Sequence, residues 1–188
     1  MIIKILGLDP SLSNFGIVSV DFNLLTNEIV KVNKIRLVET STTKEKNVRK
    51  NSDDLNRAVQ LVSALLEESK DHHIAIAEVP VGSQSARAMA SYGVCIGVLA
   101  GCPIPMIQVK PDEVKIAACG NKTASKSDMI SWASLKHPEA NWLTVKRNGV
   151  PTLTNKNEHP ADALAAVYAG IRTDQFLQAT SLMKAMSA

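Results

Sequence analysis

The order in which strand-like and helix-like segments follow one another constrains the fold of this chain most strongly. Three strands separated by short turns are predicted over Ile2–Asp9, Phe15–Asp21 and Glu28–Val38, where β-branched and apolar residues run together or alternate with polar ones. From residue 53 onward, helical periodicity alternates with short apolar runs. We therefore expect an α/β protein that begins with an antiparallel three-stranded meander.

A helix is predicted over Asp53–Lys70, because Leu55, Val59, Val62 and Leu66 recur there at spacings of four and three residues. The other predicted elements are strands over His73–Val79 and Ile104–Val109 and helices over Ser85–Leu99, Pro111–Ala118, Ser125–Leu135 and Pro160–Ile171.

Two stretches carry no clear period. Lys136–Asn157 contains His-Pro, Asn-Gly and Val-Pro dipeptides and is predicted to be a long surface loop. The residues after Asp174 either continue the last helix or fray. Gly93 and Gly97 fall inside the helix predicted over Ser85–Leu99, and we expect them to let it pack closely on the sheet.

Size and composition indicate one domain spanning residues 1–188. A chain of 188 residues, 45% of them apolar, can bury a core without disulfides or structural metals. The uncharged stretch Ala88–Val109 is broken by glycines and prolines, which argues against a membrane span, and Met1–Gly7 lacks the pattern of a secretion signal. We expect a cytoplasmic protein without membrane partners. Its cysteines match no zinc spacing and are expected to be buried, reduced thiols: Cys95, Cys102 and Cys119.

The net charge of +3 permits a polyanionic partner without requiring one. Basic residues are concentrated over residues 31–50, where the only acidic residues are Glu39 and Glu45. The seven basic residues are Lys31, Lys34, Arg36, Lys44, Lys46, Arg49 and Lys50. Acidic residues in the following helix dilute this excess. Charge alone therefore leaves both a solvated segment and a nucleic-acid patch open.

Carboxylates stand at the ends of two apolar strands, where a core strand has no structural need for them. Asp9 ends the first strand and Glu78 ends the strand over His73–Val79. Each acid taken alone could cap a turn, and Asp9 is followed by the turn-forming Pro10. If the two strands are parallel neighbours, both carboxylates emerge at one edge of the sheet, within reach of a shared cation.

A third acidic group lies at the start of the last predicted helix. His159 and Asp162 are three residues apart and Glu158 and Asp162 four apart, so they can share one helix face. Acids at this position also favour the helix dipole. Together with Asp9 and Glu78, however, they form an oxygen-rich set suited to Mg²⁺ or Mn²⁺ rather than to zinc.

Three motifs in this order resemble the RuvC-type Holliday junction resolvases of the ribonuclease H-like superfamily. GLDPSLSNFG (residues 7–16) resembles the first-strand motif of that family, IAEV (residues 76–79) its second acidic strand, and HPADALA (residues 159–165) its last-helix motif. The resemblance covers most of the chain, and the spacing of the motifs agrees with it.

The resemblance implies a ribonuclease H-like fold, with a mixed five-stranded sheet flanked by helices, and a homodimer that binds a four-way DNA junction. It also implies that Asp9, Glu78, His159 and Asp162 are the catalytic and metal-binding residues, for a pair of Mg²⁺ ions that Mn²⁺ can replace. Some members of the family have Asp in place of His159. Because only neutral imidazole can bind a metal or position water, we expect activity to fall as the pH drops through about 6.5.

Lys115 and Lys126 resemble the DNA-contacting lysines of the family in position and spacing. Taken without the resemblance, both could be solvated lysines on helix surfaces. The chain departs from the family just after Glu78, where an aromatic wedge is common and this sequence has Pro80 and Val81.

The implied activity is paired, metal-dependent phosphodiester hydrolysis in four-way junctions. The same acids could serve a nuclease for flaps, forks or RNA-DNA hybrids, and a non-catalytic DNA-binding homologue is a further alternative. Actin-like and sugar-kinase ATPases share a similar beginning but need a second domain that this length does not allow. A cellular resolvase would work with a branch-migration motor, whereas a viral one would act alone.

Overall fold

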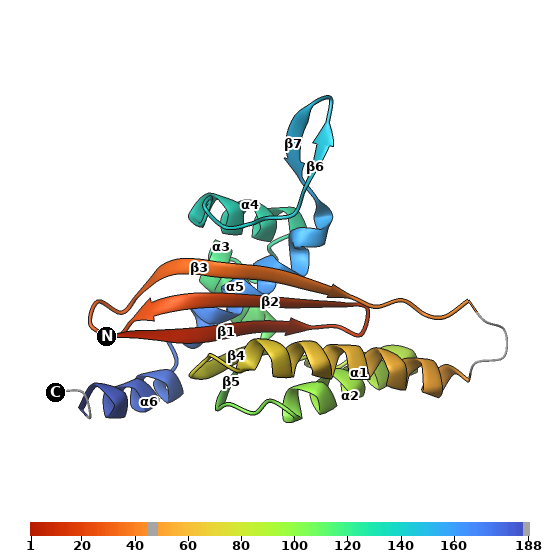
Figure 1. Ribbon diagram of the computed structural model, residues 1–188, viewed down its shortest axis with the longest axis horizontal. Helices are drawn as coiled ribbons and strands as arrows, with labels where there is room; N and C mark the ends of the chain where they lie inside the picture. Colours follow the sequence, from red (N-terminus) through yellow and green to blue (C-terminus); the bar gives the residue numbers. More distant parts are fainter. Residues whose placement is uncertain (45–48, 186–188) are drawn as a thin grey trace.

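A central strand, β1 (Ile2–Pro10), organises the computed structural model, which describes residues 1–44 and 49–185 (Figure 1). β1 pairs antiparallel with β2 (Asn14–Asn23), and β2 pairs antiparallel with β3 (Glu28–Glu39). On its other side β1 pairs in parallel with β4 (Ile74–Glu78), which pairs in parallel with β5 (Met106–Val109). The order β3-β2-β1-β4-β5 is the predicted mixed five-stranded sheet.

Helices cover both faces of this sheet. On one face, α1 (Lys50–Ser69) and α2 (Ala86–Ala100) share a buried cluster with the strands. The other face packs against α3 (Pro111–Cys119), α4 (Lys126–Lys136), α5 (Glu158–Gly170) and α6 (Asp174–Ala185). Alternation along β1 divides its side chains between the two cores: Ile3 and Ile5 face the α5 side, and Leu6 and Leu8 face the α1 side.

α5 lies unusually close to β1, because small residues meet at the contact. A Cβ atom on Gly7 would stand 2.3 Å from the carbonyl oxygen of Ala163, and one on Gly170 would stand 2.4 Å from the side chain of Ile76. A side chain at residue 7 would have to displace the backbone of α5, and one at residue 170 would have to displace the side chain of Ile76. The close packing fixes α5, which carries two of the predicted site residues, against the two strands that carry the others.

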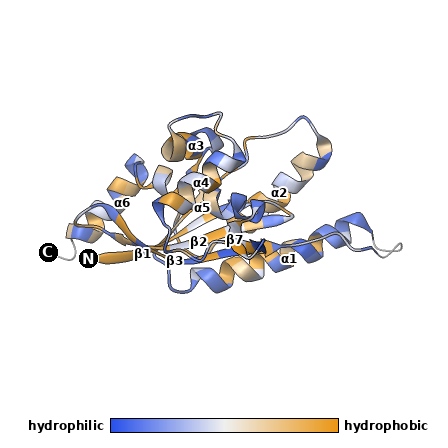
Figure 2. Cartoon of the chain, turned by 90° about the horizontal axis from the view of Figure 1, so that it is seen from above, coloured by the Kyte–Doolittle hydropathy of each residue, from blue (hydrophilic) through white to orange (hydrophobic). Residues whose placement is uncertain are grey.

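Most of the apolar stripe that predicts α1 is exposed, and of its four residues only Val62 packs against the core. Leu55 and Val59 are 64% and 55% exposed, and Leu66 is also exposed, whereas Leu61 and Leu65 make the core contact. Hydrophobic bands recur along α1 (Figure 2). The helix therefore has an apolar surface on each side. Its outward surface faces away from the sheet and lies next to α2.

Gly93 and Gly97 do not serve close packing of α2 on the sheet, contrary to expectation. A Cβ atom at either position would meet nothing within 4 Å, and both residues are exposed. α2 packs through Cys95, Val98 and Leu99 instead.

The stretch predicted to be a long loop contains a β-hairpin, which corrects that prediction. β6 (Thr144–Arg147) and β7 (Val150–Leu153) form a separate two-stranded sheet, followed by a short 3₁₀ helix over Asn155–Asn157. Asn148 and Gly149, at φ values of 49° and 81°, make the tight turn that an Asn-Gly pair favours. α5 then begins at Glu158, two residues earlier than predicted.

The chain turns after α5 and forms α6 as a separate helix, with Phe176 packed edge-to-face on Phe22. Cys95 is buried, Cys102 and Cys119 are half-buried, and all three are free thiols. None of the helices in the described residues combines the length and apolar character needed to cross a bilayer.

Part of the basic segment is paired with α1. Lys34 Nζ lies 2.6 Å from Glu68 Oε1, and Arg36 Nη1 lies 2.7 Å from carboxylate oxygens of both Glu67 and Glu68. These contacts tie β3 to α1, so the two basic residues are not a free patch for nucleic acid. Lys46 lies outside the described residues.

Candidate active site

The end of β1 brings Asp9 to the carboxyl edge of the sheet, where it meets a residue from the other end of the chain. His159 Nδ1 lies 2.6 Å from Asp9 Oδ2, so the imidazole donates a hydrogen bond to the carboxylate across 150 residues of sequence. Both side chains are largely buried. With its Nδ1 proton held by Asp9, a neutral His159 keeps the lone pair of Nε2 free for water or a metal.

Gly16 makes this contact geometrically possible, a role that the sequence alone does not reveal. It stands opposite Asp9 in the β1–β2 ladder. A Cβ atom on Gly16 would stand 2.2 Å from the carbonyl oxygen of His159 and 2.7 Å from the nitrogen of Pro160. The first turn of α5 thus packs directly against the backbone of Gly16, and any side chain at this position would displace His159.

Glu78 joins the site because β4 runs parallel to β1. Ala77 stands opposite Leu8, so the next residues, Glu78 and Asp9, leave the sheet at the same edge, as predicted. The pKa of Glu78 is raised to about 9, first by burial and then by the negative charges of Asp9 and Asp162.

Asp162 lies one turn into α5 and completes the group of carboxyls. Its pKa is raised to about 7, first by burial and then by the charge of Asp9. Its Oδ1 atom is buried and has no hydrogen-bond partner within the described residues. An unpartnered buried carboxylate oxygen is costly and calls for a donor or a cation.

The pKa of His159 is raised as well. Burial alone would lower it, but the hydrogen bond to Asp9 and the charges of Asp9, Glu158 and Asp162 outweigh that effect. In the metal-free protein, the imidazole therefore helps to balance the negative charge of the carboxyl group.

These side chains fit a hard divalent cation in their chemistry. They supply three carboxyl groups and one imidazole, the carboxyls repel one another, and Asp162 offers a free oxygen. No three His, Cys, Asp or Glu side chains in residues 1–44 and 49–185 already stand close enough to hold an ion. Binding would have to draw the carboxylates together against their present repulsion.

The two predicted lysines lie in different surroundings. Lys115 on α3 is half-buried, and its charge lowers the pKa values of both Glu78 and Asp162, which places it beside the acids. Lys126 at the start of α4 is exposed and pairs with Glu158 at 2.7 Å. The charge of Lys126 is thus partly balanced at the helix end that carries His159.

A surface hollow of about 200 Å³ gives access to the acids, with Asp9 and Glu78 in its wall. Its rim includes Pro80 and Val81, and Val81 is 75% exposed. Tyr92 of α2 also lines this hollow.

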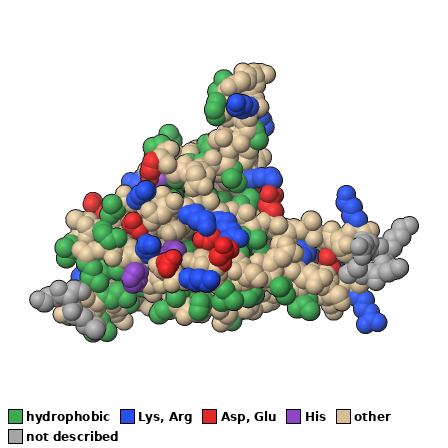
Figure 3. Space-filling model, in the orientation of Figure 1, with side chains coloured by type: hydrophobic (Ala, Val, Ile, Leu, Met, Phe, Trp, Pro, Cys, Tyr) green, Lys and Arg blue, Asp and Glu red, His purple; other side chains and the backbone are tan. Residues whose placement is uncertain are grey.

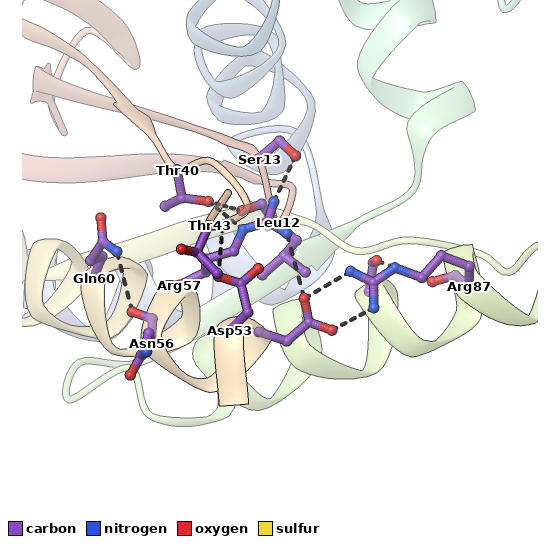
Figure 4. A network of polar contacts seen from close by, with 11 residues as sticks. Leu12, Ser13, Thr40, Thr43, Asp53, Asn56, Arg57, Gln60 and Arg87 are labelled. Carbon is purple, nitrogen blue, oxygen red and sulfur yellow. Dashed lines mark hydrogen bonds and ion pairs between the residues drawn. The ribbon is translucent and has the colours of Figure 1, made fainter. Parts of the chain in front are cut away.

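A polar network behind the β1–β2 turn, undetected in the sequence, fixes the turn that follows Asp9 (Figure 4). The buried Arg57 of α1 donates to Ser13 Oγ at 2.8 Å and to Thr40 Oγ1 at 2.9 Å, and Thr40 donates in turn to the carbonyl of Leu12. Asp54 pairs with Arg57 and with Arg87 of α2. The residues of this network are far apart in sequence, so no local sequence motif could predict it.

No protein-family model matches the sequence, and no curated protein matches it either. Among solved structures, the chain is similar to Thermus thermophilus RuvC in complex with a Holliday junction substrate, with 18% identity, a TM-score of 0.60, and coverage of 89% of this chain and 92% of that one. A second Thermus thermophilus RuvC structure gives 17% identity, a TM-score of 0.59 and coverage of 88% and 92%. The chain therefore has the ribonuclease H-like fold seen in RuvC.

Proposed function

We propose that this protein is a divalent-metal-dependent endonuclease that cuts branched DNA, with four-way junctions as its substrate. The observation that carries the proposal is the meeting of Asp9, Glu78, His159 and Asp162 at one edge of the sheet. The fold supports it, since a RuvC of the same fold has been solved with a Holliday junction substrate.

The acids would bind the metal, and His159 would accept the proton of the attacking water. Two bound Mg²⁺ or Mn²⁺ ions would activate the attacking water and stabilise the leaving 3′ oxygen. Asp9 contacts the imidazole, and its charge acts on Glu78 and Asp162, so Asp9 would hold the metal together with those two acids. Nε2 of His159 would orient the water, because Nδ1 is already committed to Asp9.

Lys115 would stabilise the phosphate. Its half-buried charge already acts on Glu78 and Asp162, so a phosphate bound between them would lie within its field. A fixed cation at this place favours the additional negative charge of the transition state. Lys126 would contact DNA less directly, after exchanging Glu158 for a backbone phosphate.

Paired cutting needs two active sites, and the outward surface of α1 and α2 offers a contact for a second copy. Leu55 and Val59 on α1 and Met89 and Ile96 on α2 are exposed. A groove of about 440 Å³ between the two helices is lined mainly by apolar residues, including Gly97. We propose that this surface forms a homodimer, which would bury apolar area that the monomer leaves in water.

A panel of substrates tests the proposal. Purified protein with Mg²⁺ or Mn²⁺ is offered a four-way junction, a flap, a fork, a plain duplex and an RNA-DNA hybrid, beside Asp9→Asn and the matched control Asp112→Asn, whose carboxylate lies exposed on α3. We expect the junction to be cut fastest by the wild type and by Asp112→Asn, and not by Asp9→Asn.

The other outcomes separate the alternatives. Faster cutting of the flap, fork or hybrid would keep the metal site but replace the substrate. Junction binding without any cutting, with either metal, would identify a non-catalytic DNA-binding protein.

A further inference from the structure

The β6–β7 hairpin stands away from the rest of the molecule (Figures 1 and 3). All of β6 and most of β7 are exposed, and the two strands pair only with each other. The apolar residues Val145 and Val150 are 44% and 63% exposed. A two-stranded ribbon without a core beneath it is marginal in water, so the fold itself gains little from this hairpin.

The hairpin is also cationic. No acidic residue occurs between Asn141 and Asn157, and Lys146 and Arg147 directly precede the turn at its tip. Within the described part of the chain, neither of these two side chains forms an ion pair or a hydrogen bond. Other cations near the site do pair, as Lys156 does with Glu39 at 2.8 Å.

The base of the hairpin is fixed to the active-site helix. Asn157, fully buried, accepts a hydrogen bond from the backbone nitrogen of Leu143 at 2.8 Å and donates to the carbonyls of Leu143 at 2.8 Å and Thr154 at 3.0 Å. The next residues along the chain are Glu158 and His159. The direction of the hairpin is thus set by the same turn of chain that positions His159 on Asp9.

From this geometry we propose that the β6–β7 hairpin is a DNA-binding arm, which grips the duplex next to the phosphate cut at the acidic site. The inference rests on the proposed function and adds a contact to it. Lys146 and Arg147 bind backbone phosphates, and the apolar side chains of the ribbon lie against the groove.

The dimensions agree with this use. Four residues of strand extend about 13 Å, which exceeds the depth of about 8.5 Å of the major groove, and the groove is wide enough for a two-stranded ribbon. Because the ribbon has no partner in the sheet and carries only positive charge, duplex DNA complements it in both shape and sign.

The test compares Lys146→Gln/Arg147→Gln with Lys31→Gln/Lys70→Gln, a control that removes the same charge from exposed lysines at the opposite end of the sheet. Binding of a four-way junction is measured in Ca²⁺ at several salt concentrations. Each lost phosphate contact lowers the slope of log Kd against log salt by about 0.9, so we expect a decrease of about 2 per protomer for the hairpin variant. The control should keep the wild-type slope.

Hydroxyl-radical footprinting supplies the second readout. We expect the wild type to protect a stretch of duplex backbone beside the cleavage site, and the hairpin variant to lose that protection alone. An unchanged slope with an unchanged footprint would overturn the inference. So would a change of oligomeric mass in the hairpin variant, which would make the hairpin a contact between protein chains. Failure of the wild type to bind or cut any branched DNA would instead contradict the proposed function.

Discussion

At the scale of single residues, the site depends on a glycine as much as on its acids. Gly16 lets the backbone of His159 approach β2, and this approach places the imidazole on Asp9. Asp9 and Glu78 could be chosen from the sequence because carboxylates at the ends of core strands are unusual, and His159 and Asp162 because their motif resembles that of a known family. Gly16 could not, because its reason lies in a contact with a helix more than 140 residues away in the chain.

Gly16→Ala should therefore impair cleavage severely, by at least tenfold, while the protein still folds with reduced stability. A Cβ atom 2.2 Å from a carbonyl oxygen must displace the first turn of α5. The matched control is Gly93→Ala, whose Cβ meets nothing and whose helix should gain up to about 1 kcal/mol. Single-turnover cleavage and urea unfolding check both variants. Equal cleavage by Gly16→Ala and wild type would show that the close approach does not position His159.

Glu78→Gln should abolish cleavage and yet stabilise the metal-free protein. The carboxyl has a pKa of about 9 in the folded state against 4.5 as its ordinary value, so between these pH values the folded state holds a proton that the unfolded state has lost. Wild-type stability thus falls as the pH rises through this window. The variant lacks this loss, so its free energy of unfolding at pH 7 should exceed that of the wild type by roughly 1 to 3 kcal/mol. Urea unfolding in EDTA at pH 5 and pH 8 measures this difference. If the free energies of unfolding of the two proteins change with pH in parallel, the burial of this charge is refuted.

Cleavage should decline as the pH falls below about 7. Asp162 has a pKa of about 7 in the metal-free protein, and the pKa of His159 is also raised, so acid protonates both. Protonation weakens metal binding by Asp162 and removes the free Nε2 lone pair of His159 that would orient water. The sequence alone placed this decline near pH 6.5. Higher Mg²⁺ should move the midpoint to lower pH, since metal and protons compete. A rate profile that is flat from pH 8 to 5.5 at limiting metal would argue against the proposed roles of both residues.

At the scale of elements, the strands were predictable and the surfaces were not. Apolar runs ending in turn residues located the five strands of the sheet, and the parallel pairing of β4 with β1 brought Asp9 and Glu78 to one edge as expected. The hairpin was missed because its Asn-Gly turn lies between strands of only four residues each, one of which contains Pro151. The stripe on α1 predicted the helix correctly, but periodicity alone cannot distinguish a face that packs on the core from an exposed apolar face.

The outward surface of α1 gives the prediction that belongs to this scale. Leu55→Glu/Val59→Glu should produce a folded monomer, because both side chains are exposed and contribute little to the core. Leu61→Glu serves as the contrasting change and should unfold the protein, since this leucine is fully buried. Light scattering gives the mass and circular dichroism the fold. A monomeric wild type, or an unaltered dimer in the double variant, would contradict the proposed interface.

At the scale of the whole molecule, the two ends of the chain make one site. Asp9 lies on β1 of the meander, Glu78 ends β4, and His159 and Asp162 lie in α5, which packs across the sheet. The order of motifs predicted this arrangement, and the similarity of fold to RuvC agrees with it. The hairpin lies outside those motifs, and the Arg57 network joins Leu12 and Ser13 of the first motif to residues outside it, through contacts that only the folded chain creates.

The central claim is that two such sites, acting together, cut a four-way junction. The most direct measurement maps the nicks in a junction whose four strands are each labelled in turn, in Mg²⁺, for the wild type and Asp9→Asn. The account predicts nicks at symmetric positions in two opposite strands, absent without metal and absent in Asp9→Asn. An intact junction at saturating wild-type protein and Mg²⁺, or nicks that persist in Asp9→Asn, would contradict it.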